Sequence, residues 1–232
     1  MSEYIGTLET GFAVAIDGPA GSGKTSFAER LAEIYGVDPE CQIIHADHYF
    51  EPVDKPGVDA LEGAPGGFNV GRFMTQVGDS FNDPDVPLRV QEYNWQTDSY
   101  IDRPPPNPKQ LIVVEGIKLI GLPVYWGAKV WMHVPRSVRK QRFLNRNPAD
   151  RRMPETDQAV LLDRFNLWAD DADAYEEFVS PHEGRTITVV RGDIIPAQQL
   201  VRVLSSINSR RPKWVDPPKH SLEWCQEAFA KN

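Results

Sequence analysis

The chain has little positive charge and no run of lysines and arginines. Its 232 residues include 25 Lys and Arg against 33 Asp and Glu, which gives a formal net charge of −8. Nucleic acids and anionic membrane surfaces are bound through clustered positive charge, so the composition argues against both as partners. The N-terminal stretch MSEYIGTLET also lacks the basic and apolar segments of a secretory signal.

Cysteines and long hydrophobic runs are scarce as well. Cys41 and Cys225 form no motif, which is typical of a reducing compartment. The most apolar stretch, 111–126, is interrupted by Glu115 and Lys118 and cannot span a bilayer. These absences predict a soluble cytoplasmic protein. A chain of this length can bury a sizeable core, and one domain with insertions is expected.

One stretch, residues 12–32, organises the rest of the chain. It begins with the apolar run FAVAI, continues with GPAGSGKT and ends with SFAERLA. The apolar run predicts a strand buried on both faces, and the helical spacing of Phe27, Leu31 and Ile34 predicts a helix after the loop. Between them, residues 18–25 fit the pattern GxxxxGK(S/T) at every fixed position. This order predicts a phosphate-binding loop.

The residue types of this loop match the chemistry of a bound polyphosphate. Glycines let backbone N–H groups converge on the phosphates, and the helix start adds free N–H groups and a positive dipole end. Lys24 would supply a mobile charge for the β- and γ-phosphates, and the Thr25 hydroxyl would ligate Mg²⁺. We therefore expect ATP and Mg²⁺ as cofactors. The predicted nucleotide-binding residues are Gly18, Ala20, Gly21, Ser22, Gly23, Lys24, Thr25 and Ser26.

Four more apolar segments are typical of strands: 42–46, 111–115, 129–134 and 186–190. Helical spacing predicts a short helix over 68–77, a basic helix over 136–147, and longer helices over 160–178 and from 196. Strands that alternate with helices predict an α/β fold with a doubly wound, mostly parallel five-stranded sheet.

Three segments interrupt this alternation. The Gly- and Pro-rich stretch 51–67 predicts a long surface loop. Alternating residues predict a β-hairpin insertion over about 84–103. The core domain would span 1–210, and 211–232 would be a C-terminal extension.

Two carboxylates follow predicted strands at the edge where ligands of such sheets bind. Asp47 follows the second strand and Glu115 ends the third, so both should lie near the phosphate-binding loop. Phosphoryl transfer needs one carboxylate to orient or deprotonate the attacking hydroxyl and another to hold Mg²⁺. We predict Asp47 as the base and Glu115 as the metal partner, with the two roles open to sharing. Each could instead cap a helix or end a strand. His45 and His48 beside Asp47 have no further ligand set, so we expect wall or surface histidines rather than a metal site.

Arginines and aromatic residues supply further candidates. Four arginines lie across the boundary of a helix and a loop: Arg142, Arg146, Arg151 and Arg152. Such a group could close over phosphate charge as a lid of about 142–155, or form a solvated helix face. Tyr93 and Trp95 could stack on a planar ring or pack across the hairpin.

These motifs together resemble the uridine kinase and phosphoribulokinase group of P-loop kinases. The similarity covers about 12–190 and rests on GPAGSGKT, HADHYF, GGFNVGRF, EYNW, VVEGI, RFLNR with DRR, and YEEFVSP, in that order. The resemblance implies that Asp47 is the base for a sugar hydroxyl and that Glu115 and Thr25 serve Mg²⁺. It also implies that the region of Arg146 and Arg151 forms the lid, and that Phe50, Tyr93 and Trp95 wall the acceptor pocket.

Three positions depart from the pattern of the resembled group. Asn69 stands where uridine kinases carry an Asp that grips ribose hydroxyls, and Asp98 lies near the place of a base-reading His. Arg146-Asn147 replaces an Arg-Asp pair. Asn69 and Arg142 remain candidates for acceptor binding. We expect an ATP-dependent kinase that phosphorylates a primary hydroxyl of a small molecule, with a nucleoside as the first candidate.

Other functions stay open from the sequence. Within kinases, a phosphoribulokinase-like or pantothenate-kinase-like acceptor is the nearest alternative. A nucleotide-dependent regulatory binder is another, although the base-reading N-K-x-D sequence of many GTPases does not occur in the chain. A small molecule is the expected partner, and the sequence predicts no oligomeric state.

Overall fold

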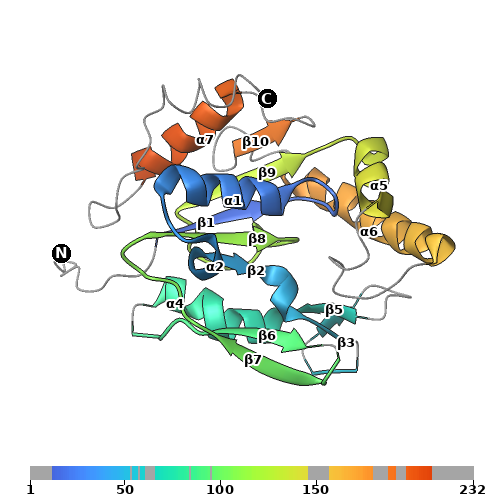
Figure 1. The fold of residues 1–232 in the computed structure, drawn as a ribbon, viewed down its shortest axis with the longest axis horizontal. Coiled ribbons are helices and arrows are strands. Elements are labelled where there is room, and N and C mark those ends of the chain that lie inside the picture. The colour runs from blue at the N-terminus through green and yellow to red at the C-terminus, as the bar shows by residue number, and fades with distance from the viewer. Residues whose placement is uncertain are drawn as a thin grey trace.

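The centre of the molecule is a parallel β-sheet with the strand order β10-β9-β1-β8-β2 (Figure 1). The computed structural model describes residues 12–52, 54–56, 58–60, 66–83, 85–94, 96–145, 157–179, 188–191 and 197–210. The five strands of the sheet are β1 (Phe12–Asp17), β2 (Ile43–His45), β8 (Leu111–Gly116), β9 (Ala128–His133) and β10 (Thr188–Arg191). Each neighbouring pair is parallel. The predicted α/β class with a doubly wound parallel sheet is confirmed.

Helices and smaller elements cover both faces of the sheet because successive residues of a strand point to opposite sides. Val14 and Ile16 of β1 pack in a core with α1 (Lys24–Tyr35) and α7 (Ala197–Arg210). Ala13 and Ala15 pack in a second core with Phe73, Trp126 and their neighbours. In Figure 1, α1 and α7 lie on one side of the sheet, and the hairpin and α4 lie on the other. Every residue of β1 is buried, as its apolar run predicts.

The turn after β2 places Asp47 at the carboxyl edge of the sheet. The predicted strand 42–46 is shorter than expected, because Gln42 ends the one-turn helix α2 (Pro39–Gln42). Asp38 caps that helix through Glu40 N, and Pro39 occupies its first position. The strand then runs only through Ile43–His45, and Asp47 lies on the 3₁₀ turn η1 (Ala46–Tyr49).

The stretch after η1 is structured where the structure describes it, so the prediction of a long surface loop over 51–67 was wrong. It forms a three-stranded antiparallel sheet of β3 (Phe50–Pro52), β5 (Gly66–Asn69) and β4 (Val58–Ala60). Phe50 pairs with Phe68 across this sheet, with ring centroids 6.0 Å apart. Such pairing joins residues far apart in the chain, which local composition does not reveal.

The predicted helix over 68–77 begins later and ends later. Asn69 caps α3 (Val70–Phe73) by accepting the Arg72 N–H at 2.9 Å. A π-helical turn, η2 (Met74–Gly78), and α4 (Asp79–Asn82) follow. The predicted hairpin is confirmed, with strands β6 (Val90–Asn94) and β7 (Ser99–Arg103).

Two helices lie beyond the carboxyl ends of the central strands, α5 (Arg136–Asn145) and α6 (Gln158–Val179) (Figure 1). Ion pairs join them: Arg139 and Arg136 lie 2.9 and 3.3 Å from the Asp173 carboxylate. The rest of the predicted lid, 146–155, and the extension 211–232 lie outside the described residues. In the part of the chain that the structure describes, no helix is long and apolar enough to cross a bilayer.

Candidate active site

The phosphate-binding loop has the conformation that its glycines predict. Gly21 and Gly23 adopt φ of 77° and 87°, which L side chains rarely adopt. At Gly21 a Cβ would also lie 2.6 Å from the Arg139 carbonyl oxygen, so α5 packs directly on the loop. Lys24 begins α1 and donates from Nζ to the Pro19 carbonyl at 3.1 Å. The neutral Pro19 carbonyl is a weaker acceptor than a charged phosphate oxygen. A bound phosphate would therefore replace it as the partner of Lys24.

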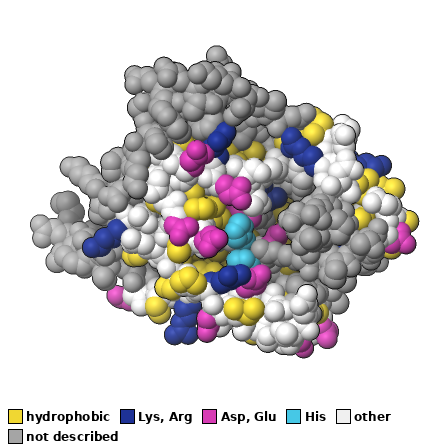
Figure 2. Space-filling model, in the orientation of Figure 1, with side chains coloured by type: hydrophobic (Ala, Val, Ile, Leu, Met, Phe, Trp, Pro, Cys, Tyr) yellow, Lys and Arg dark blue, Asp and Glu magenta, His cyan; other side chains and the backbone are white. Residues whose placement is uncertain are grey.

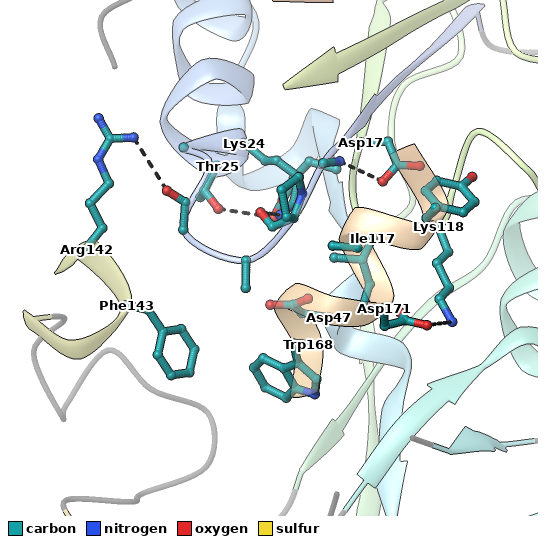
Figure 3. Close-up of a pocket in the computed structure, with 18 of the residues that line it drawn as sticks. Asp17, Lys24, Thr25, Asp47, Ile117, Lys118, Arg142, Phe143, Trp168 and Asp171 are labelled. Atoms are coloured by element: carbon teal, nitrogen blue, oxygen red, sulfur yellow. Dashed lines mark hydrogen bonds and ion pairs between the residues drawn. The ribbon is translucent and has the colours of Figure 1, made fainter. Parts of the chain in front are cut away.

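A cavity of about 510 Å³ lies in front of this loop (Figure 3). Seven of the eight predicted nucleotide-binding residues line it: Gly18, Ala20, Gly21, Gly23, Lys24, Thr25 and Ser26. Ser22 is 2% exposed and does not line the cavity, because its part of the turn faces the protein interior. The cavity is large enough for a small-molecule ligand.

Glu115 and Thr25 form the candidate metal site. Thr25 lies on α1 and Glu115 lies on β8. Thr25 Oγ1 donates to Glu115 Oε1 at 3.3 Å. The same carboxylate oxygen lies 2.6 Å from His45 Nδ1. Hydroxyl and carboxylate oxygens are the donors that Mg²⁺ prefers, so the pair fits this ion. The sequence reasoning missed His45 as a partner of Glu115. The signal was available, because β2 and β8 are neighbours and His45 lies opposite Glu115 in their register.

Asp47 and Phe50 line the same cavity as Lys24, Thr25 and Glu115. The structure therefore brings together the phosphate loop and both predicted carboxylates at one edge of the sheet. In Figure 3, Asp47 lies between Arg142 at one end of the view and Lys118 at the other. Histidine side chains lie among carboxylates near the middle of the face drawn in Figure 2.

A buried carboxylate that the sequence reasoning missed supports the loop and also lines the cavity. Asp17, at the end of β1, accepts the Gly18 N–H at 2.7 Å and the Ile120 N–H at 2.9 Å. Burial raises the pKa of Asp17 from 3.8 to about 6, and the N–H groups of Ile120 and Gly18 oppose this rise. Asp17 thus joins the phosphate loop to the loop after β8. It directly precedes the motif, but the pattern contains no position for it.

Three predicted acceptor residues lie elsewhere than expected. Asn69 is buried, where it caps α3 and donates to the Glu51 carboxylate at 3.0 Å. Tyr93 is 5% exposed and donates its hydroxyl to Asp98 at 2.6 Å. Neither residue lines the cavity, because their polar groups bind other parts of the protein. Arg142 does line it, but Nη1 lies 3.5 Å from the Gly21 carbonyl, on the side of the phosphate loop.

Trp95, Arg146 and Arg151 lie outside the described residues, so their predicted roles stay predictions. The cavity has other walls that the sequence reasoning did not assign to a ligand. Helix α6 contributes Trp168, Asp171 and Tyr175, among others, and the loop after β8 contributes Ile117 and Lys118. The helical spacing of the α6 residues predicted an amphipathic helix, and periodicity alone does not separate a core face from a cavity wall.

Comparison with known proteins supports a kinase. No protein-family model matches the chain. A cytidylate kinase from Methanocella arvoryzae is 30% identical over 161 residues, which cover 68% of this chain and 78% of the relative. The sheet, the loop and this relative define the chain as a P-loop kinase, a nucleotide-binding phosphotransferase.

Two solved structures are similar to the chain, and each match covers 76% of this chain and 88% of the other. One, from Silicibacter sp. TM1040, is provisionally named a fructose transport system kinase (TM-score 0.50, 19% identity). The other, from Bacillus stearothermophilus, is provisionally named a uridine kinase (TM-score 0.47, 17% identity). At 19% identity the first likeness concerns the fold alone. The chain belongs to the family of P-loop kinases that includes the cytidylate kinase, and the prediction of a P-loop kinase is confirmed.

Proposed function

We propose that this protein transfers the γ-phosphoryl group of ATP, with Mg²⁺, to a hydroxyl group of a small molecule, with a nucleoside as the first candidate. The observation that carries the proposal is the shared cavity. Lys24, Thr25 and Glu115 line it together with Asp47, which comes from a different strand end. Phosphoryl transfer requires a phosphate cradle, a metal site and a group that prepares the nucleophile, all within reach of one another.

Each residue has a chemical task in this proposal. The loop N–H groups and the start of α1 bind the phosphates, and Lys24 neutralises charge that develops on the transferred group. Thr25 and Glu115 would hold Mg²⁺, which would supply positive charge to offset the negative charge of the phosphates. His45 orients the Glu115 carboxylate from behind, as outer partners of metal ligands do. Asp47 orients the acceptor hydroxyl and takes its proton.

The name of the cytidylate kinase relative points to a second candidate, an acceptor that is itself a nucleotide. Asp47 favours the hydroxyl acceptor. A carboxylate can accept the proton of an alcohol, whereas an acceptor phosphate is already ionised at neutral pH and would be repelled by it. Outside the phosphate loop and α5, two described cations line the cavity, Lys118 and Arg164, and Lys118 is paired with Asp171 at 3.1 Å.

The proposal is tested by offering Mg·ATP with a panel of acceptors and identifying the products by mass spectrometry. The panel contains cytidine, uridine, adenosine, CMP, UMP, fructose, ribulose 5-phosphate and pantothenate. We expect acceptor-dependent ADP release with a nucleoside and a nucleoside monophosphate as product, abolished by EDTA. Conversion of CMP to CDP without any nucleoside phosphorylation would replace the first candidate by the second. Equal ATP hydrolysis with and without every acceptor would contradict both.

A further inference from the structure

The cavity beyond Asp47 is walled by helix α6 and the loop after β8, not by the hairpin. Phe50, Ile117 and Lys118 line this part together with Trp168, Asp171, Ala172 and Tyr175. None of the described hairpin residues lines it. Polar side chains of the hairpin bind one another instead, as the hydrogen bond from the Tyr93 hydroxyl to Asp98 shows. The acceptor must therefore contact α6 and the loop after β8.

A charged pair at this wall is held in a fixed position. Lys118 Nζ lies 3.1 Å from Asp171 Oδ1, as the dashed line in Figure 3 marks. Their side chains are 30% and 29% exposed, so each can still meet a ligand. Lys118 has φ of 60°, which is uncommon for a residue with a side chain and is concentrated at functional sites.

Contacts on both sides keep the pair in place. Asp17 accepts the N–H of Ile120, two residues after Lys118, at 2.9 Å. On α6, the Tyr175 hydroxyl accepts the Gly121 N–H at 2.6 Å. The loop and the helix are thus tied together next to the pair, which presents one cationic donor and one anionic acceptor side by side.

The neighbouring wall offers apolar and aromatic surface. Phe50, Ile117 and Trp168 line the same part of the cavity. The indole Nε1 atoms of Trp131 and Trp168 are buried and have no hydrogen-bond partner among the described residues. Both tryptophans line the cavity, but these nitrogens are closed off from solvent, so other atoms of the two side chains face a ligand. The apolar and aromatic part of this wall suits a planar ligand, whose polar edge can then meet Lys118 and Asp171.

We propose that Lys118 and Asp171 determine the acceptor specificity of the kinase by binding the edge of a pyrimidine base. Lys118 donates to a ring carbonyl oxygen or ring nitrogen, and Asp171 accepts from the adjacent ring N–H or exocyclic amino group. Carboxylates bind amino groups of bases in this way elsewhere in proteins. The inference rests on the proposed function and narrows its acceptor to a pyrimidine nucleoside.

Asp171→Asn tests the proposal, with Asp170→Asn as a matched control. Asp170 is the preceding residue of α6, pairs with Arg136 and does not line the cavity. We expect Asp171→Asn to raise the KM for cytidine or uridine by about 10- to 100-fold, while the KM for ATP and the thermal midpoint match those of the control. Lys118→Met should also raise the nucleoside KM. If the pair only fastened α6, Asp171→Asn would change the KM for ATP and the thermal midpoint as much as the nucleoside KM, which would overturn the proposal.

Methylated nucleosides test the same contact from the side of the ligand. N3-methyluridine and N4,N4-dimethylcytidine lack the donor that Asp171 would accept from. The wild type should use them about 10- to 100-fold less well than uridine and cytidine, and Asp171→Asn should reduce this difference. Wild-type activity that is equal on methylated and parent nucleosides would overturn the proposal.

Direct binding separates failure of this inference from failure of the proposed function. Calorimetry with a non-hydrolysable ATP analogue measures nucleoside affinity without turnover. Nucleoside binding that Asp171→Asn weakens and Asp170→Asn preserves would support the specificity pair. If no phosphorylated product formed in that case, only the proposed reaction would be contradicted. Binding that is absent, or equal in the wild type and both variants, would overturn the pair.

Discussion

The two halves of the cavity are built in different ways. The nucleotide half, which is proposed to bind ATP, comes from one contiguous stretch, in which eight residues from Gly18 to Ser26 line the cavity. The acceptor half comes from η1, β3, the loop after β8 and α6, which lie far apart in the chain. A bound phosphate needs the same cradle whatever the acceptor, so local chemistry fixes the first half. Residues in one wall of the acceptor half can therefore be substituted without altering the nucleotide half.

Lys24→Met should have the largest effect within the nucleotide half, because it removes the mobile charge of that half. We expect kcat to fall about 1,000-fold, as for the loss of one preorganised donor to developing charge. Steady-state ADP release measures this loss. Lys140→Met is the control, since Lys140 is exposed on α5 and does not line the cavity. Equal activity of the two variants would mean that Lys24 does not act on the transferred phosphate.

Arg72→Met should break the support of the acceptor half. Arg72 pairs with Glu51, which is fully buried, and donates to the carbonyls of His48 at 2.7 Å and Gln91 at 2.9 Å. It thereby joins η1, which carries Asp47, to the hairpin. Loss of the arginine leaves a buried carboxylate unpaired, so we expect the free energy of unfolding to fall by about 3–5 kcal/mol.

Urea denaturation of Arg72→Met and Arg103→Met provides the comparison. Arg103 also pairs with a glutamate, Glu92, but on an exposed strand, so its loss should cost less than about 1 kcal/mol. Similar costs for the two variants would contradict the structural role assigned to Arg72.

Glu115→Gln should weaken the proposed metal site, which would serve both halves. The substitution keeps the shape of the side chain but removes the negative charge that Thr25 and His45 contact. We expect the Mg²⁺ concentration for half-maximal activity to rise about 10- to 100-fold. A Mg²⁺ titration at saturating ATP measures it, with Glu33→Gln on the exposed side of α1 as the control. An unchanged Mg²⁺ requirement would exclude Glu115 as a metal partner.

Asp17→Asn should have the smallest effect, and this effect should depend on pH. Because the pKa of Asp17 is raised to about 6, the folded protein binds a proton between pH 6 and pH 4 more readily than the unfolded chain does. This residue therefore contributes stability that is present at low pH and is lost as the pH rises through 6. Between pH 7 and pH 5, the stability of the wild type relative to Asp17→Asn should increase by about 1 kcal/mol. Urea midpoints at the two pH values measure this difference, and a difference that does not change with pH would contradict the raised pKa.

The sequence predicted the fold and the conformation of the phosphate loop well because their signals are local. A run of buried apolar residues, a glycine-rich loop and an amphipathic helix each occupy a few consecutive positions. The position of Asp47 and Glu115 at one edge followed from a rule of parallel sheets rather than from any contact. The contact between His45 and Glu115 could have been predicted by pairing the ends of β2 and β8.

The acceptor half was harder to predict because its determinants are long-range. Nothing in the local sequence shows that Asn69 would cap a helix beside a buried Glu51, or that Tyr93 would bind Asp98. The pairing of β3 with β5 is equally non-local, so the Gly- and Pro-rich composition of this stretch predicts a loop instead. Lys118 and Asp171 are 53 positions apart in the sequence (171 − 118), and only the fold brings them together.

The kinetics of Asp47→Asn test the central claim most directly. If Asp47 takes the proton of the acceptor hydroxyl, acceptor-dependent ADP release should fall about 100- to 10,000-fold. The affinity for the ATP analogue should stay within about twofold of the wild type, because the phosphate loop is untouched. Acceptor-dependent turnover at the wild-type rate in Asp47→Asn would contradict the account.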